Sequence, residues 1–104
     1  MIIRVFEGRL KPGGEQDYMA GERELLGRTD IPGLTSQSLG RRIGPGGQLH
    51  VITITVWADR ESLERWVPDA FDTPVYLAGS EDLVESWTLH HFEQVEEIAG
   101  GFAT

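Results

Sequence analysis

Residues 49–58 constrain the fold more than any other part of this 104-residue chain. They are rich in β-branched side chains that alternate loosely with threonines, a pattern that predicts a β-strand. Both faces of that strand are fairly apolar, so we expect it to lie centrally in a sheet that is covered on both sides.

The rest of the pattern predicts three more strands and two helices. Strands are expected at residues 2–10, 34–43 and roughly 84–95, and helices at residues 15–28 and after the N-cap residue Asp59. Right-handed crossovers turn this βαββαβ order into a four-stranded antiparallel sheet whose first and third strands are central. The predicted class is a ferredoxin-like α+β fold with both helices on one face.

Two helices cover only one face of such a sheet. The bare face would carry Ile3 and Val5, or their neighbours of opposite parity, together with one apolar row of residues 49–58. Leaving it in water costs on the order of 25 cal/mol per Å² of apolar area. We therefore expect a homodimer whose two sheets pack face to face.

The composition excludes several classes of partner. Nine basic residues against seventeen acidic ones give a net charge of -8, which argues against nucleic acid and against an anionic membrane surface. With no cysteine, disulfides and thiolate metal sites are impossible. No basic leader and no membrane-spanning apolar segment are present, so the sequence predicts a soluble, cytoplasmic protein. We expect one domain, residues 1–96, with a tail at residues 97–104 that frays.

One stretch has a strong family character. Residues 55–66, Thr-Val-Trp-Ala-Asp-Arg-Glu-Ser-Leu-Glu-Arg-Trp, combine a strand ending in Trp57, a short charged cap and a helix bearing Trp66. With Pro32-Gly33 and the early segment 8–13, they make the chain resemble the antibiotic biosynthesis monooxygenase family of dimeric α+β barrels. The resemblance covers about residues 2–95 and identifies fold better than chemistry.

The haem-degrading branch of that family resembles the chain only in part. Trp66 matches its helix-borne Trp, but Gly8 stands where that branch has an Asn. Val75 or Tyr76 stands where it has the iron-ligating His. The resemblance therefore implies no haem degradation unless Tyr76 ligates the iron, and we expect no cofactor.

The other branch resembles cofactor-independent oxygenases of polycyclic phenols or quinols, in which the substrate anion itself reduces oxygen. The resemblance thus implies a monooxygenase acting on a small aromatic or polyketide-like ligand. Such chemistry needs an aromatic-lined cleft, a proton acceptor and a donor that stabilises the anion. A polyketide cyclase or isomerase on the same barrel, or a non-catalytic ligand-binding dimer, are the alternatives.

Aromatic residues are the candidates for substrate binding. Trp66 is expected as a cleft wall or as core, and Tyr76 as a ligand-orienting phenol or as a cap on the core edge. Phe71 and Trp57 are further candidates, for which plain packing is the competing interpretation.

Three histidines and Tyr76 are the candidates for catalysis, because the unperturbed pKa of histidine suits proton transfer near neutrality. His90 and His91 are adjacent in the last strand and so point to opposite faces. They cannot readily share a metal ion, and no metal site is predicted. His50, in the row of Ile52 and Ile54, would suit the mouth of a cleft or the surface.

Overall fold

The computed structural model describes residues 1–27, 30–67, 71–76 and 79–96. The elements run in the order β1 (Ile2–Leu10), α1 (Glu15–Leu26), β2 (Leu34–Ile43), η1 (Pro45–Gly47), β3 (Leu49–Trp57), α2 (Arg60–Trp66), η2 (Ser80–Leu83), β4 (Val84–Glu93), where η marks a short 3-10 helix. The predicted βαββαβ order is therefore confirmed. None of the described helices is long and apolar enough to cross a bilayer. The predicted tail, residues 97–104, lies outside the described residues.

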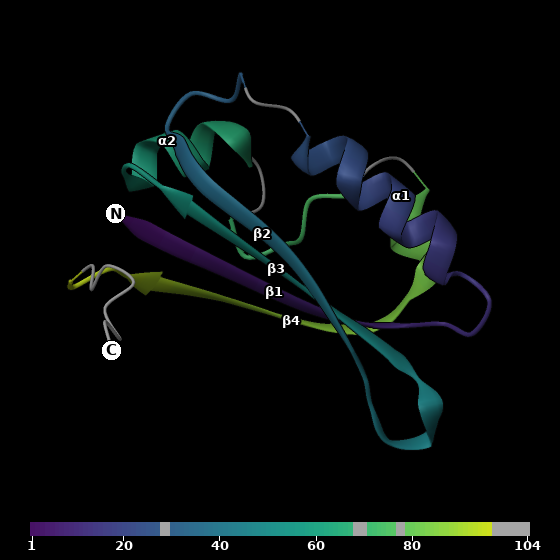
Figure 1. Ribbon diagram of the computed structural model, residues 1–104. Coiled ribbons are helices and arrows are strands. Elements are labelled where there is room, and N and C mark those ends of the chain that lie inside the picture. Colours follow the sequence, from purple (N-terminus) through teal and green to yellow (C-terminus); the bar gives the residue numbers. More distant parts are fainter. Residues whose placement is uncertain (28–29, 68–70, 77–78, 97–104) are drawn as a thin grey trace, which may run out of the picture.

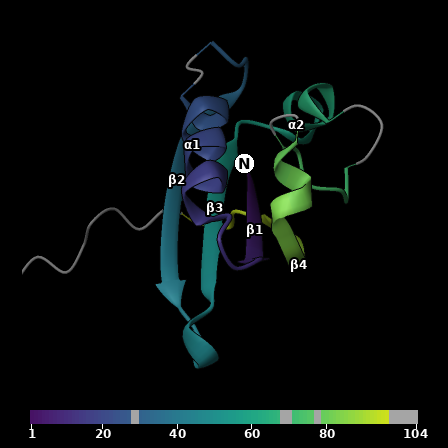
Figure 2. The same cartoon turned by 90° about the vertical axis from the view of Figure 1, so that its right-hand side faces the viewer.

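The four strands form one antiparallel sheet in the order β2-β3-β1-β4, so β1 and β3 are central as predicted. Both α-helices lie on the same side of this sheet, α1 over one end and α2 over the other (Figures 1 and 2). The ferredoxin-like fold class is thus confirmed.

Strand register fixes which side chains face the helices. In β1 these are the residues that pair with Thr53 and Thr55 of β3, namely Phe6 and Arg4. Two buried clusters form beneath the helices, one around Tyr18 and one around Trp57. The first contains Phe6, Leu10, Tyr18, Leu49 and Val51, and the second contains Trp57, Leu63 and Val67.

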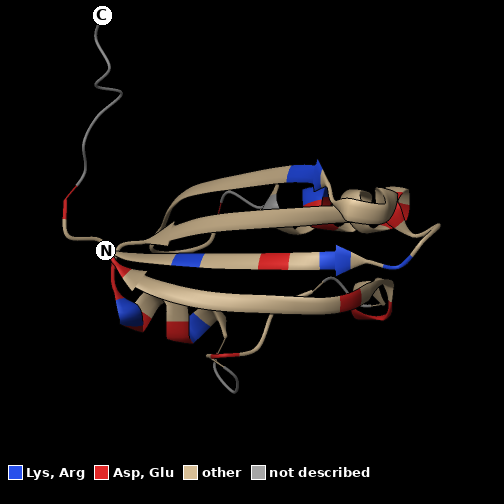
Figure 3. Ribbon diagram, turned by 90° about the horizontal axis from the view of Figure 1, so that it is seen from below, with Lys and Arg blue, Asp and Glu red and all other residues tan. Residues whose placement is uncertain are grey.

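The opposite sheet face is not covered by any described helix (Figure 3). It carries a row of apolar side chains. It comprises Ile3 and Val5 of β1, Ile52, Ile54 and Val56 of β3, and Phe92 of β4. Those of β1 and β3 are half-buried and Phe92 is 53% exposed. Within one chain β3 is therefore covered on one side only. The prediction of a bare apolar face is confirmed, and its β1 members are Ile3 and Val5.

The loop before β2 positions α2. Gly33 has a φ of +83°, and a Cβ there would lie 2.3 Å from the Ser62 side chain, so only glycine fits between the loop and the helix. The Gly33 carbonyl accepts a hydrogen bond from the backbone N–H of Ala58 at 2.7 Å. Asp59 caps the helix by accepting from the backbone N–H of Ser62, also at 2.7 Å. These contacts start α2 directly after β3 and place Trp66 above the sheet.

Candidate functional site

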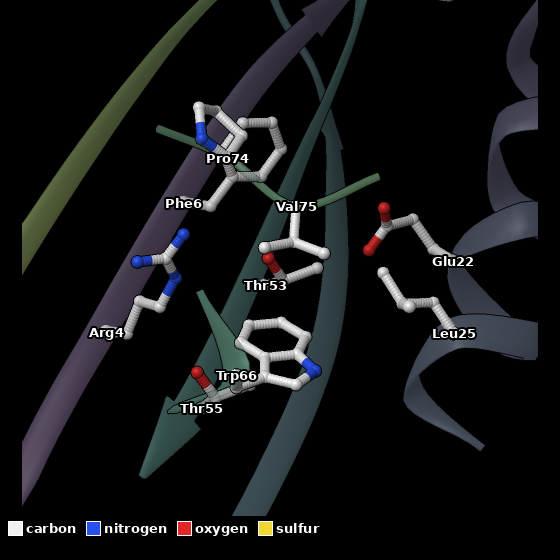
Figure 4. Close-up of a pocket in the computed structure, with 9 residues that line it drawn as sticks. All are labelled: Arg4, Phe6, Glu22, Leu25, Thr53, Thr55, Trp66, Pro74 and Val75. Carbon is white, nitrogen blue, oxygen red and sulfur yellow. The ribbon is translucent and has the colours of Figure 1, made fainter. Parts of the chain in front are cut away.

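A small cavity lies between the two buried clusters, enclosed by the sheet, both α-helices and the segment 71–76. The space open to the centre of a water molecule is about 20 Å³, enough for one or two waters. Figure 4 shows its lining, which is Arg4, Phe6, Glu22, Leu25, Thr53, Thr55, Trp66, Pro74 and Val75. Five of these nine residues are apolar or aromatic and two are threonines of the sheet, so the two charged ones, Arg4 and Glu22, stand out.

Glu22 is a carboxyl group inside the core. It lies on the sheet-facing side of α1 between Tyr18 and Leu25, at i−4 and i+3, and is only 4% exposed. Burial raises the pKa of Glu22 to about 7, and the neighbouring Tyr18 hydroxyl opposes part of that rise. No ion pair joins it to any described cation. A carboxyl group in this state exchanges a proton near neutral pH.

Two phenol groups lie close to that carboxyl. The Tyr18 and Tyr76 hydroxyls are buried, and within the described part of the chain neither makes a hydrogen bond of good geometry. Burial and then the charge of Glu22 raise the pKa of Tyr76 to about 12, and the same two causes raise the pKa of Tyr18 further. Both phenols are therefore protonated donors at neutral pH. The Tyr76 ring packs edge-on against Phe6, with centroids 5.7 Å apart.

Arg4 stands on the other side of the cavity from Glu22 (Figure 4). It projects from β1 on the helix side and is 4% exposed. Burial lowers the pKa of Arg4 to about 10, and Asp72 opposes that change, so the guanidinium stays charged at neutral pH. It donates to the carbonyls of Phe71 at 2.9 Å and Thr73 at 2.8 Å. A buried cation held by neutral carbonyls retains an uncompensated positive charge that attracts an anion.

His91 completes the surroundings of Arg4. Its Nε2 lies 2.8 Å from Nη1 of Arg4, and its ring stacks on Phe71 with centroids 4.0 Å apart. His91 does not itself line the cavity. Of the adjacent pair, His91 is the histidine on the helix side.

Trp66 separates the cavity from a wider groove on the outside of the protein. Its ring lines the cavity and also the groove, whose other walls are Asp30, Ile31, Pro32, Ser62 and Arg65. It packs against Trp57, with ring centroids 5.1 Å apart, and the Arg4 guanidinium lies 5.8 Å from its centroid. Trp66, predicted as a cleft wall or as core, thus both packs on the buried Trp57 cluster and lines the cavity.

Two predicted histidines lie away from the cavity. His50 is on the open sheet face with Glu7, whose carboxylate is 3.8 Å from its Nδ1, and it does not line this cavity. His90 pairs with Val5 on that same face and is exposed. The cause is the alternation of side chains along a strand: His50 and His90 each follow a residue that faces the helices, so their own side chains point to the opposite face.

The two other aromatic candidates for substrate binding, Trp57 and Phe71, do not line the cavity. Trp57 is fully buried in the core, donates from Nε1 to Oγ1 of Thr55 at 2.9 Å, and does not line the cavity. Phe71 packs between His91 and the Arg60 guanidinium, 4.2 Å from its ring, and contributes its carbonyl to Arg4 rather than its ring to the cavity.

Sequence reasoning did not identify Glu22 and Arg4 as site residues. The signal for Glu22 was present: it falls on the apolar stripe of its helix, between Tyr18 and Leu25. The signal for Arg4 was its parity with Phe6 and Leu10, which became readable only once the covered face of β1 was known.

The assembled site can remove a proton from a ligand and stabilise the resulting anion. Glu22 supplies the proton acceptor, Arg4 the fixed positive charge, and Trp66 an aromatic wall. Within the described residues no group of His, Asp and Glu side chains has the arrangement of a metal site.

The architecture defines a class of protein, the ferredoxin-like α+β domains with one uncovered sheet face. Among solved structures, the chain resembles antibiotic biosynthesis monooxygenase-like proteins of this class. An antibiotic biosynthesis monooxygenase is 19% identical over 92% of this chain and 100% of its own, with a TM-score of 0.67. A dimeric ferredoxin-like protein from an uncultured marine organism is 17% identical over 93% and 97%, with a TM-score of 0.67.

A third similar structure is a heme-degrader. MhuD from Mycobacterium tuberculosis, with two hemes bound in its active site, is 13% identical over 94% of this chain and 99% of its own, with a TM-score of 0.60. No family model and no curated protein matches the sequence. At these identities the likeness shows the fold, and the chemistry has to be argued from the site.

Proposed function

We propose that the protein is a cofactor-independent monooxygenase of small aromatic or polyketide-like substrates, with Glu22 as the base and Arg4 as the anion-stabilising cation. The observation that carries the proposal is a buried carboxyl group with a pKa of about 7 across an aromatic-walled cavity from a buried guanidinium. The ideal catalytic pKa lies near the working pH, and Glu22 lines the cavity, whereas none of the predicted histidines does.

The reaction follows from those two groups. Glu22 takes a proton from an acidified CH₂ or phenolic O–H of the substrate, and Arg4 stabilises the charge on the substrate oxygen. The electron-rich anion then reduces O₂. For a CH₂ group, one oxygen atom becomes the new carbonyl, and the other leaves as water with the two hydrogens. The substrate supplies all the electrons, so the step requires no further reductant.

Substrate access requires Trp66 to move. The cavity has room for one or two waters and is too small for an aromatic ring. The outer groove begins on the far side of the Trp66 indole. Rotation of this one side chain toward the groove would join the two spaces and leave its ring as a stacking wall for a planar ligand.

A polyketide cyclase or isomerase is the second candidate, because the same base and cation serve any enolisation. The third candidate is a non-catalytic ligand-binding dimer, which the small size of the cavity favours. Oxygen consumption separates the first candidate from the other two, and substrate conversion separates the second from the third.

Haem does not fit the residues of this site. A Cβ at Gly8 would lie 2.9 Å from the Phe6 ring, so that ring fills the place of the Asn side chain expected in the haem-degrading branch. Tyr76, a possible iron ligand by position, keeps its proton, with a pKa of about 12. Titration with hemin should give no stoichiometric Soret shift; a shift at one equivalent would overturn this conclusion.

The test of the proposed function is oxygen uptake with a reduced polycyclic phenol such as an anthrone. We expect the native protein to consume one O₂ per anthrone oxidised, faster than buffer does. Glu22→Gln should abolish the enhancement, whereas Glu24→Gln, an exposed carboxylate of the same helix, should leave it unchanged. Equal uptake by the native protein and Glu22→Gln would exclude Glu22 as the base.

The protein is further proposed to act as a cytoplasmic homodimer with residues 1–96 as its single domain. The support for the dimer is the apolar row on the open sheet face, together with the similarity to a dimeric ferredoxin-like protein.

A further inference from the structure

The Arg4 guanidinium is held by three acceptors on one side of the cavity. Two are the backbone carbonyls of Phe71 and Thr73, and the third is Nε2 of His91 at 2.8 Å from Nη1. Arginine has donors only, so Nε2 must accept this hydrogen bond with its lone pair. The contact therefore requires a neutral imidazole that carries its proton on Nδ1.

The imidazole is fixed in this orientation by its neighbours. Its ring stacks on Phe71 at 4.0 Å with an interplanar angle of 25°, and its side chain is only 14% exposed. Nδ1 faces Asp72, whose Oδ1 lies 4.0 Å away. A ring stacked on Phe71 and held at Nε2 cannot turn without breaking the contact with Arg4.

We propose that His91 is a positioning residue: as the neutral imidazole it holds the Arg4 guanidinium at the cavity, and on protonation it releases it. This inference rests on the proposed role of Arg4 as the anion-stabilising cation. It assigns to His91 an action through Arg4 and no proton transfer with the substrate.

The surroundings of His91 favour the neutral form. Burial lowers the pKa of His91, and Arg4 on β1 lowers it further. Asp72 in the segment 71–76 raises it, while Arg60 on α2 and His90 on β4 lower it. These surroundings together lower the pKa of His91, so its protonation requires a more acidic solution than that of an ordinary histidine.

Protonation of His91 turns its attractive contact with Arg4 into a repulsive one. An imidazolium has two donors, so Nε2–H would face the Nη1–H of a guanidinium across 2.8 Å. Because the two cations repel, either the ring or Arg4 must move. The carbonyls of Phe71 and Thr73 then hold Arg4 alone.

The tests use NMR of the full-length protein. In long-range ¹H–¹⁵N spectra at pH 8, we expect His91 to show an unprotonated Nε2. Slowly exchanging guanidinium signals, assigned to Arg4 by their loss in Arg4→Met, should broaden as His91 titrates. In Arg4→Met the pKa of His91 should rise, because a cation beside it is gone.

Two variants separate positioning from packing. His91→Gln keeps an acceptor near the place of Nε2 and does not titrate, so its Arg4 signals should persist at pH 5; His91→Phe should lose them at every pH. A thermal melt of each variant checks that it is folded. Asp72→Asn controls for the neighbouring carboxylate. In this variant the Arg4 signals should still broaden over the same pH range in which His91 titrates.

An Nε2–H tautomer at pH 8, or Arg4 signals indifferent to His91, would overturn the positioning role whatever the activity of the protein. Where oxygen uptake is observed, the acid side of the kcat/KM profile provides a second readout. The slope of log kcat/KM against pH should approach two in the native protein, because both Glu22 and His91 must be deprotonated. It should approach one in His91→Gln, in which only Glu22 titrates. Absence of uptake with the NMR results intact would count against the proposed function alone.

Discussion

At the scale of single residues, the candidate site consists of polar groups placed where the core would otherwise be apolar. Glu22 and Arg4 are each 4% exposed, and no ion pair connects them across the cavity. Isolated buried charges destabilise a fold, and their retention in a small core is typical of functional sites.

The raised pKa of Glu22 makes the free energy of unfolding depend on pH. Between its usual value of 4.5 and about 7 the folded chain binds more protons than the unfolded chain, so stability falls as the pH rises through this window. Above pH 7 the loss amounts to about 3 kcal/mol, at 1.36 kcal/mol per pKa unit. Glu22→Gln should remove this loss, and urea unfolding at pH 4.5 and pH 8 measures it.

The matched control is Glu24→Gln, whose exposed carboxylate should give the same stability difference from the native protein at both pH values. Equal stability of Glu22→Gln and the native protein at pH 8 would show that Glu22 ionises freely.

The Tyr76 hydroxyl is buried without a hydrogen-bond partner among the described residues, and such a group costs about 1–3 kcal/mol. Tyr76→Phe keeps the ring contact with Phe6 and removes the hydroxyl. We expect it to stabilise the protein by about 1 kcal/mol in urea unfolding while it weakens ligand binding. A loss of stability instead would reveal a partner such as a bound water.

At the scale of elements, the position of α2 depends on how closely the loop before β2 approaches it. Trp66 closes the cavity from the last turn of this seven-residue helix. A helix so short is not stable by itself, so its cap and its loop contact determine where the indole lies.

Gly33→Ala tests this contact, with Gly46→Ala as the matched control. Both glycines have positive φ, +83° and +79°, but a Cβ at Gly46 meets nothing within 4 Å while one at Gly33 overlaps Ser62. We expect about 1–2 kcal/mol of destabilisation for Gly46→Ala, from its backbone alone. Gly33→Ala should lose clearly more, and Ser62→Gly should restore part of the difference. Equal losses would refute the overlap.

At the scale of the whole molecule, both α-helices lie on one side of the sheet (Figures 1 and 3). The other side carries the uncovered apolar row. β3 contains no Asp, Glu, Lys or Arg between Leu49 and Trp57, and its histidine, His50, lies at the end of the apolar row, so the middle of this strand favours an apolar partner over water. A second copy, packed sheet to sheet, removes this surface from water.

Ile54→Lys places a cation in the middle of that row, opposite Val5. We expect the native protein to sediment at twice the chain mass of 11.6 kDa, and Ile54→Lys at the chain mass. Ala20→Lys, on the exposed side of α1, should remain dimeric. A native monomer at micromolar concentration would contradict the sheet-to-sheet dimer.

Much of the fold could be predicted because its signals are local. Turn residues, strand composition and the Asp59 cap marked the elements to within a few residues, and crossover handedness left one sheet order. The site was predicted only in part. Trp66 lies at the cavity, whereas His50 and His90 lie on the opposite face.

The sequence by itself determined the element order, the central place of β1 and β3, and the existence of one bare sheet face. Only the tertiary structure decided which parity of each strand is covered. That choice buries Arg4, places His91 in contact with it, and puts Arg4 across the cavity from Glu22 of α1. The physical reason is that the local sequence shows which residues share a face of a strand. Which of the two faces is buried depends on where residues distant in the chain pack.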